Sequence, residues 1–235
     1  MLSVSSASFY VASMLITCEY LHKQNIVHRD IRPEKFMIND KGSLLLLDMR
    51  SAKVLQKLRG EYRTTTVVGT PHYMAPEIIA GNGYSFAVDY WSIGVCLFEF
   101  MWGTVPFGDG MGDPMQIYES ILGTELAYPK NSMSADKKKA EECISIMLSR
   151  CPEARTLGEV GNLKSIEFFD KIDWTDLLRG TQKPIHFPPV YDVISQAGIS
   201  EAIKRDHLIG DRVREDHNIT FSSLKSNTPE WDAQF

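Results

Sequence analysis

Residues 89–102 form a nearly uninterrupted apolar run, DYWSIGVCLFEFMW. A helix that is apolar on every side has to be covered all round by other parts of the chain. Gly103 follows directly, and glycine often ends a helix because it tolerates a left-handed backbone. The run therefore predicts a buried helix at the centre of a mainly α fold.

Further helices are expected around this central one. Residues 9–23 carry apolar side chains at helical spacing, and another helical segment covers 135–149. Asp113 and Pro114 open a third, as an N-cap followed by proline in the first turn. A helical bundle accounts for all three.

A small β-hairpin is expected between the first helix and the central one. Two short apolar runs, 36–38 and 44–47, flank the turn 39–42, which contains Asp-Lys-Gly. The polar stretch 49–66 has no clear period and is expected to be a long loop. Such loops in compact domains are usually functional.

Composition and charge exclude several classes of protein. The chain has 43% apolar residues and a net charge of -5, which favours a globular protein over a nucleic-acid binder. Its four cysteines form no C-x-x-C pair, as in cytosolic proteins with reduced thiols. Residues 1–18 carry no charge, but serines and threonines interrupt them and no basic segment precedes them. We interpret them as an amphipathic helix rather than a signal peptide, and expect a cytoplasmic chain without a membrane span.

Short polar motifs follow one another along the chain in a fixed order. They are His28-Arg29-Asp30, Pro33-Glu34 before the hairpin, Asp48 after it, Gly69-Thr70-Pro71 with Ala75-Pro76-Glu77, and Asp89 at the head of DYWSIG. The set resembles the protein-kinase signatures H-R-D-x-x-x-x-N, D-F-G, A-P-E and D-x-W-S-x-G, over residues from about 8 to the end. The resemblance implies a mainly α fold, the C-terminal lobe of a protein kinase with one small β-hairpin and no N-terminal lobe. Residues 1–190 would form the lobe, and 191–235 a C-terminal tail.

Phosphoryl transfer depends on positioning and charge neutralisation, and the resemblance assigns residues to both tasks. Asp30 would orient the substrate hydroxyl, and Arg32 would hold the γ-phosphate of ATP. Asp48 would bind Mg²⁺. Glu34 and Lys35 complete the expected nucleotide site.

Two acids are assigned structural roles by the same resemblance. Asp89 would accept hydrogen bonds from the backbone of the His-Arg-Asp turn, and Glu77 would pair with a buried arginine, for which Arg155 is the candidate. Considered alone, Asp48 would be a turn acid and Asp89 a helix cap.

Within the family, the chain is most similar to the cGMP-dependent kinases of the AGC group. The similarity is carried by VGTPHYMAPE at 68–77, the segment 172–181 and the closing WDAQF. It places Thr66 at the activation-loop phosphothreonine position, near Thr70, with Arg29 as the cation that would bind the phosphate. The neighbouring Thr64 and Thr65 remain alternatives.

The resemblance also implies a basic protein substrate. Glu34 and Glu119 match acids that bind arginines before the phosphorylated residue, although Glu119 could equally be an exposed helix acid. Val67, Pro71 and Met74 would form a small apolar pocket for the residue that follows.

The sequence departs from the family pattern at the nucleotide site. Only 29 residues precede Asp30, with no G-x-G-x-x-G loop and no V-A-I-K lysine among them. Lys35 stands at the metal-binding asparagine position, and an ammonium group cannot ligate a metal ion. We expect it to repel Mg²⁺ or to pair with Asp48. In place of D-F-G the chain has Asp48-Met49-Arg50, in which Met49 would fill the packing position of the phenylalanine.

Two classes of function follow. The chain is the catalytic half of an ATP- and Mg²⁺-dependent serine/threonine kinase, or a pseudokinase that keeps substrate docking and has lost phosphoryl transfer. The intact acids favour the first class, and Lys35 and Arg50 favour the second.

Overall fold

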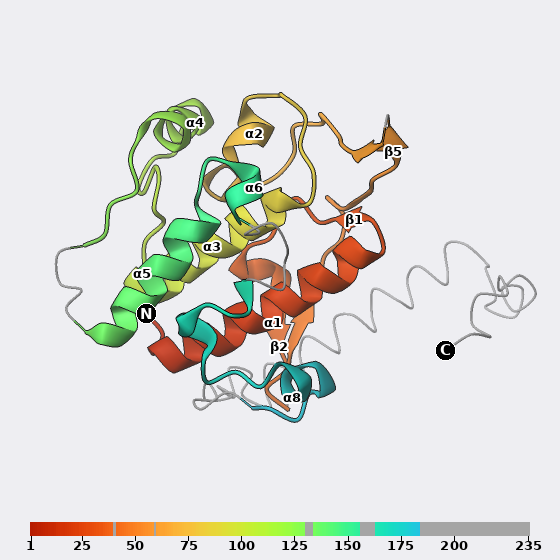
Figure 1. Cartoon of the computed structure of the whole chain (residues 1–235). Coiled ribbons are helices and arrows are strands. Elements are labelled where there is room, and N and C mark those ends of the chain that lie inside the picture. Colours follow the sequence, from red (N-terminus) through yellow and green to blue (C-terminus); the bar gives the residue numbers. More distant parts are fainter. Residues whose placement is uncertain (40, 59, 130–133, 156–162, 184–235) are drawn as a thin grey trace, which may run out of the picture. The chain divides into compact units, whose positions relative to one another are not determined.

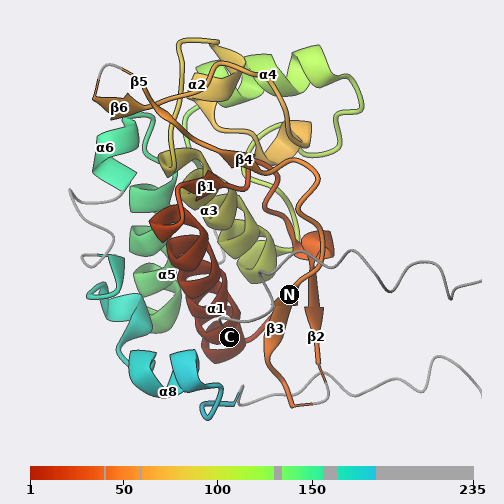
Figure 2. The ribbon, with the colours of Figure 1, turned by 90° about the vertical axis from the view of Figure 1, so that its right-hand side faces the viewer.

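Three long helices, α1, α3 and α5, pack together as the centre of the molecule (Figures 1 and 2). The computed structural model describes residues 1–39, 41–58, 60–129, 134–155 and 163–183. The expected tail, 191–235, and the end of the expected lobe lie outside these residues. The helices are α1 (Val4–Lys23), α2 (Pro76–Ile79), α3 (Ala87–Trp102), α4 (Pro114–Gly123), α5 (Ala135–Met147), α6 (Pro152–Arg155) and α8 (Trp174–Arg179), with 3-10 turns η1 (Pro33–Lys35), η2 (Pro71–Tyr73) and η3 (Glu167–Phe169).

The apolar run is helix α3, and its burial confirms the expectation. Trp91 and Ile93 are fully buried, and the ring of Trp91 stacks on Phe107. A Cβ atom on Gly94 would lie only 2.8 Å from Met147 Cβ, so glycine is what lets α5 approach α3 this closely. Gly103 ends the helix with a φ of 78°.

Helix α1 begins earlier than its apolar pattern indicated, at Val4 rather than at residue 9. The Ser3 hydroxyl accepts a hydrogen bond from the amide of Ser6 and so caps the first turn. The serines near this end therefore start the helix. None of the described helices is both long and apolar enough to cross a bilayer.

The expected hairpin is present as β2 (Phe36–Ile38) and β3 (Leu44–Leu46), which pair antiparallel with Met37 opposite Leu45. Its turn is closed by Asn39, whose side-chain oxygen accepts from the amides of Lys41 and Ser43. Gly42 supplies a positive φ of 84°.

The stretch 49–66 contains more structure than expected. Strand β4 (Lys53–Val54) pairs with β1 (Ile26–Val27), and β5 (Lys57–Leu58) pairs with β6 (Glu61–Tyr62). The expectation of one β-hairpin was therefore wrong for the described residues, which hold three two-stranded pairings. Strands of two residues are too short to show an alternating pattern, so only their backbone pairing reveals them.

Cysteine chemistry agrees with the expectation. All four cysteines are free, and Cys18, Cys96 and Cys143 are buried. Burial raises the pKa of the Cys143 thiol. Burial likewise raises the pKa of the Cys18 and Cys96 thiols, so these three thiols are parts of the core, whereas Cys151 is exposed.

Candidate functional site

The His-Arg-Asp turn is held by Asp89 at the start of α3. Asp89 Oδ2 accepts from the amide of His28 at 2.9 Å, and its Oδ1 accepts from the amide of Arg29 at 2.8 Å. Nε2 of His22 lies 2.7 Å from Oδ2. Burial alone would raise the pKa of Asp89, but the hydrogen bonds from His22 and the two amides hold it below its ordinary value. The structural contact expected for this acid is therefore present.

This anchoring explains an unusual backbone conformation. Arg29 has a φ of 69°, in the left-handed region that non-glycine residues rarely adopt. Such a conformation costs on the order of 1–3 kcal/mol and persists only where surrounding contacts impose it. The carboxylate of Asp89 binds the amide of Arg29 itself, and so fixes the turn that presents Asp30.

Asp30 is almost buried, with 8% of its surface exposed, and contacts two different segments. Its Oδ1 accepts from the hydroxyl of Thr70 at 2.7 Å and from the Thr70 amide at 3.1 Å. Its Oδ2 lies 2.9 Å from Lys35 Nζ. Arg32 Nε lies 3.8 Å from the same carboxylate, while its Nη1 pairs with Glu34 at 3.1 Å. The structure thus brings these five expected site residues together.

Asp48 lies beside them at the end of the hairpin. Its Oδ2 is 2.5 Å from Lys35 Nζ, as the sequence interpretation allowed, and 2.8 Å from Arg50 Nη2. Hydrogen bonds from Arg50 first, and from Lys35 second, hold the pKa of Asp48 far below its ordinary value. Hydrogen bonds to Asp48 first, and to Asp30 second, raise the pKa of Lys35. His28 Nε2 donates to the backbone oxygen of Asp48 at 2.7 Å and joins this corner to the turn.

Of the two residues after Asp48, Met49 differs from the expectation. Met49 is 40% exposed in the described chain, so it does not fill a packed position there. Arg50 is not among the residues with a positive φ, so the backbone at this point does not need glycine. Its side chain instead folds back onto Asp48.

The loop that carries Thr66 is tied to Arg29 through a tyrosine. Tyr84 is buried, and its hydroxyl donates to the backbone oxygen of Thr66 at 2.5 Å. Arg29 Nη1 lies 3.4 Å from the same hydroxyl, and Arg29 Nε donates to the backbone oxygen of Ser51. The side chain of Thr66 is exposed.

A second cation at this loop escaped the sequence interpretation. Lys53 Nζ donates to the Thr64 hydroxyl at 2.8 Å. Its backbone lies in β4, which pairs with the strand just before His28. Only this pairing reveals that Lys53 and Arg29 flank the same loop.

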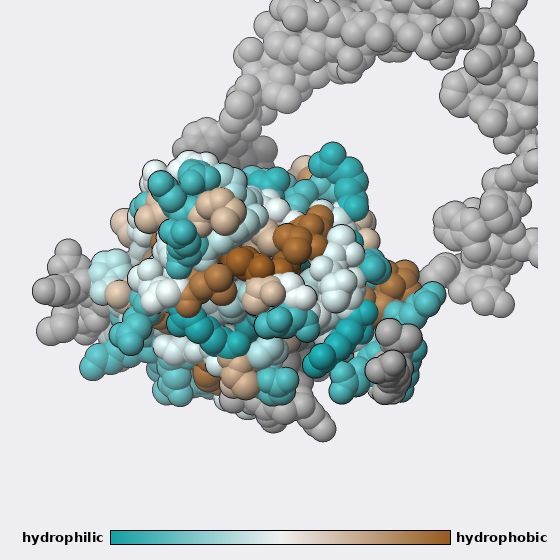
Figure 3. Space-filling model, turned by 90° about the horizontal axis from the view of Figure 1, so that it is seen from above, coloured by the Kyte–Doolittle hydropathy of each residue, from teal (hydrophilic) through white to brown (hydrophobic). Residues whose placement is uncertain are grey.

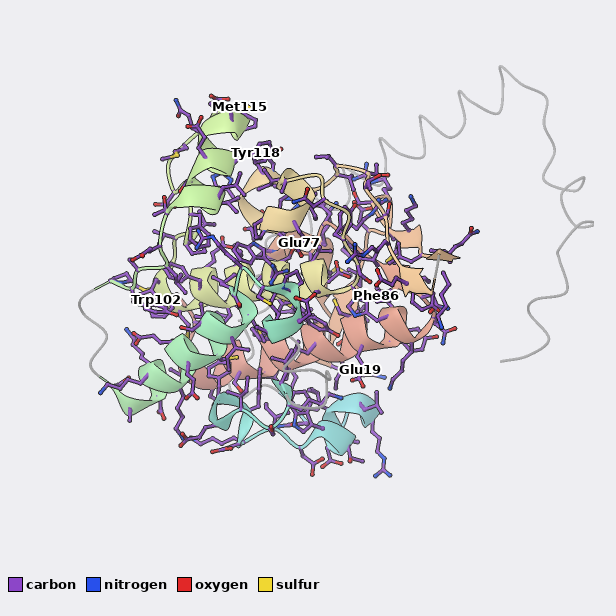
Figure 4. All side chains as sticks on the ribbon, turned by 45° about the horizontal axis from the view of Figure 1, so that its top comes forward. Glu19, Glu77, Phe86, Trp102, Met115 and Tyr118 are labelled. Atoms are coloured by element: carbon purple, nitrogen blue, oxygen red, sulfur yellow. The ribbon has the colours of Figure 1, made fainter. Side chains whose placement is uncertain are left out.

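The expected pair of Glu77 and Arg155 is formed. Arg155 donates from both terminal nitrogens to the two oxygens of Glu77, at 2.6 and 2.7 Å. Its guanidinium is fully buried and lies over the ring of Trp91. Glu77 lies on α2 near the middle of the molecule (Figure 4). The contact ties α2 to α6 and α3.

Of the residues expected to bind substrate, Pro71 lies in η2, which contacts α4, and Glu119 lies in α4 itself. Helices α2 and α4 lie at one end of the described molecule (Figures 1 and 2). Val67 is 57% exposed, whereas Met74 is buried, with the Tyr118 hydroxyl 3.6 Å from its sulfur. Pro71 is half-buried at the start of η2. Apolar side chains gather across this face of the molecule (Figure 3).

Two acids were expected to bind substrate arginines. Glu119 is exposed on α4, as either interpretation of this residue allows, and Glu34 lies in η1. A different acid, Glu99, accepts from the Tyr73 hydroxyl at 2.7 Å. Burial, that hydrogen bond and the nearby charges of Glu99 and Glu34 raise the pKa of Tyr73. Glu99 and Glu34 thus both act on Tyr73. The position of Glu99 as a lone acid late in the apolar run was the signal that could have identified it.

The helical bundle holds Asp30 and Asp89 in fixed positions and contains the ion pair between Glu77 and Arg155. Together these features define a site of the protein-kinase class. The chain belongs to the protein kinase domain family, whose model matches residues 1–163. It is 40% identical over 189 residues to a cGMP-dependent protein kinase of Toxoplasma gondii, covering 79% of this chain and 18% of that protein. The cGMP-dependent protein kinase of Plasmodium berghei is 40% identical over 180 residues, covering 75% of this chain and 20% of the relative. The serine/threonine-protein kinase gad8 of Schizosaccharomyces pombe is 35% identical over 211 residues, 87% of this chain and 36% of gad8.

These relatives make the chain similar to the AGC serine/threonine kinases, as its motifs indicated. The chain spans about a fifth of the length of the cGMP-dependent kinases that it matches.

Kinases of this family use ATP with Mg²⁺, held by the aspartate of D-F-G and the asparagine of the catalytic loop. The residues present here do not fit the metal. The asparagine position is Lys35, which offers donors only. Both oxygens of Asp48 already accept hydrogen bonds from Lys35 or Arg50. We therefore derive no step through a metal ion.

Proposed function

We propose that the chain is the substrate-docking C-terminal lobe of an AGC-type kinase, residues 1–190, followed by an AGC-type tail, 191–235. It holds a basic protein segment with a serine or threonine near Asp30, and by itself transfers no phosphate. The observation that carries this proposal is the pair of hydrogen bonds from Thr70 to Asp30. They join the catalytic turn to the segment that, by resemblance, faces the substrate.

The charges at this end suit a basic partner. Glu34 has a largely exposed side chain, and the charges of Glu34 and Glu99 both act on Tyr73. Arginine binds carboxylates with two parallel hydrogen bonds, so two acids favour a segment with more than one arginine. Val67, Pro71 and Met74 would take the apolar residue that follows the serine or threonine, and Glu119 would add a further acid.

The absence of phosphate transfer is proposed from the residues of the expected nucleotide site. Arg32 would approach the γ-phosphate of ATP, but it is paired with Glu34 in the described structure. Asp48, the acid that would bind Mg²⁺, is paired with Lys35 and Arg50. These pairings support docking without metal-assisted transfer.

A second candidate is an active transferase within a longer protein. The intact Asp30, with its anchoring by Asp89, favours it, because the residue that would orient a substrate hydroxyl is held in place. In that case Thr66 would be a phosphorylation site that activates the enzyme.

Fluorescence anisotropy with a labelled peptide carrying two arginines before a serine tests the docking proposal. Glu34→Gln and Glu99→Gln should each weaken binding by about two- to fivefold, as expected for partly exposed charge pairs. Glu125→Gln, at an exposed acid after α4, is the matched control and should leave binding unchanged. Equal affinity in all four proteins would contradict docking at this end.

A radiolabelled-ATP assay separates the two candidates. We expect no Mg²⁺-dependent transfer to the peptide by the chain alone. Turnover that disappears in Asp30→Ala would support the transferase instead.

A further inference from the structure

We propose that Lys35 is a built-in cation that takes the place of a divalent metal ion between Asp30 and Asp48, so that the chain keeps this pair of carboxylates closed to Mg²⁺. The inference deepens the proposed function, and it rests on that function for the assignment of Asp48 to the metal position.

The geometry of the ammonium group supports this role. Lys35 Nζ lies 2.9 Å from Asp30 Oδ2 and 2.5 Å from Asp48 Oδ2. Its side chain is only 8% exposed, although lysine is almost never buried unless it is paired. One positive charge therefore bridges two acids that come from different motifs.

The lysine is held in position by its own backbone. Its amide donates to the backbone oxygen of Arg32 at 3.0 Å, within the turn η1. Its backbone oxygen accepts from the amide of Leu47 at 2.8 Å, and Leu47 directly precedes Asp48. Because both peptide groups are tied down, Nζ is directed between the two acids rather than sampling solvent as a surface lysine does.

The Oδ1 atoms of the two acids also accept hydrogen bonds. Asp48 Oδ1 accepts from the amide and Nε of Arg50, both at 3.0 Å. Asp30 Oδ1 accepts from the amide and hydroxyl of Thr70. A Mg²⁺ ion needs several oxygen ligands in near-octahedral geometry, and here it would also meet the buried ammonium group.

The simpler interpretation is that Lys35 forms an ordinary ion pair. The two interpretations differ in whether a metal ion can enter the site. An exposed pair is worth little and opens readily to a competing cation. The Lys35 side chain is only 8% exposed and bridges both acids, so a metal ion could enter only by displacing the ammonium group from both carboxylates. Exchange of this one residue for the neutral oxygen ligand asparagine should therefore open the pair.

Manganese is a suitable probe because electron paramagnetic resonance reports free Mn²⁺ directly. The full chain would be titrated at neutral pH, alongside Lys35→Asn and Lys35→Gln. The matched control is Lys41→Asn, which makes the same change at an exposed lysine in the turn of the same hairpin. Asp48→Asn, alone and combined with Lys35→Asn, identifies binding at the proposed pair.

We expect the unaltered chain and Lys41→Asn to show no saturable Mn²⁺ binding that depends on Asp48. Lys35→Asn should bind one Mn²⁺ at least about tenfold more tightly than Lys41→Asn, and should lose it when Asp48 is also replaced. One Mn²⁺ bound by the unaltered chain and lost in Asp48→Asn would overturn the inference, whether or not the Lys35 variants fold. So would folded Lys35→Asn and Lys35→Gln proteins that bind no better than the control. Peptide anisotropy needs no metal, so failure of docking and failure of this inference are distinguishable.

Discussion

The guanidinium of Arg155 and the carboxylate of Glu77 form a two-pronged ion pair, 2.6 and 2.7 Å long, although 78 residues separate them. Arg155 also donates to the backbone oxygens of Ser149 and Ala87. Its buried charge is therefore satisfied by α2, by the end of α5 and by the start of α3 together.

Removing one member of this pair should be costly. Glu77→Ala leaves a fully buried guanidinium without its carboxylate, and breaking such a pair typically costs about 3–5 kcal/mol. Urea unfolding of the full chain measures the loss. The same replacement at the exposed Glu125 should change the free energy of unfolding by less than about 0.5 kcal/mol. Similar decreases in the free energy of unfolding of the two variants would show that the buried pair stabilises the fold no more than an exposed acid does.

Stability should depend on pH through Asp89. Its pKa is lowered in the folded state, so the unfolded chain binds its proton at higher pH than the folded chain does. The stabilisation is then fully present above the unfolded value of about 3.9, and is lost as pH falls from there through the lower folded pKa.

Asp89→Asn isolates this contribution. The variant should be less stable than the unaltered chain at pH 7, since an asparagine cannot accept with both side-chain atoms from His28 and Arg29. The difference should shrink as pH falls below about 4. Urea titrations between pH 3 and 7 give both curves, and a difference that is constant with pH would contradict the assignment.

Packing between α3 and α5 should tolerate no added methyl group at Gly94. The new Cβ would lie 2.8 Å from Met147 Cβ and 3.0 Å from Leu148 Cδ2. Gly94→Ala should destabilise by about 1–3 kcal/mol, despite the better helix propensity of alanine. Gly123→Ala, where nothing lies within 4 Å, should be neutral or slightly stabilising in the same thermal melt. A neutral Gly94→Ala would mean that the two helices separate easily.

Phosphate on Thr66 should order the loop around it. The phosphate brings a charge of about −1.5 to −2, and both Arg29 and Lys53 flank this loop. Protein carrying genetically encoded phosphothreonine at position 66 should resist limited proteolysis between residues 49 and 70. Arg29→Ala should abolish the protection and Lys53→Ala should reduce it, while Lys57→Ala serves as a matched control. Equal cleavage with and without the phosphate would leave Thr66 an ordinary loop residue.

Much of the architecture follows from local sequence. The burial of α3 was predictable because a helix apolar on every side has no face to offer to water. The β2–β3 hairpin was predictable from its turn, in which Asn39 and Gly42 satisfy local requirements. The order of motifs from His28 to Asp89 identified the family, and the expected contacts of Asp89 and of Glu77 are present.

Other features were decided only by the tertiary structure. Sequence spacing suggested Glu119 as a substrate-binding acid and did not single out Glu99, whose hydrogen bond with Tyr73 depends on the fold. The sequence allowed Lys35 to pair with Asp48, but it did not predict the bridge to Asp30. That bridge depends on how η1 meets the end of the hairpin. Lys53 reaches the Thr66 loop because β4 pairs with β1. Local pattern fixes which face of a segment is buried, since that depends on neighbours along the chain. Which charges meet is set by packing between distant segments, because a charge interacts with whatever the fold brings within a few ångströms.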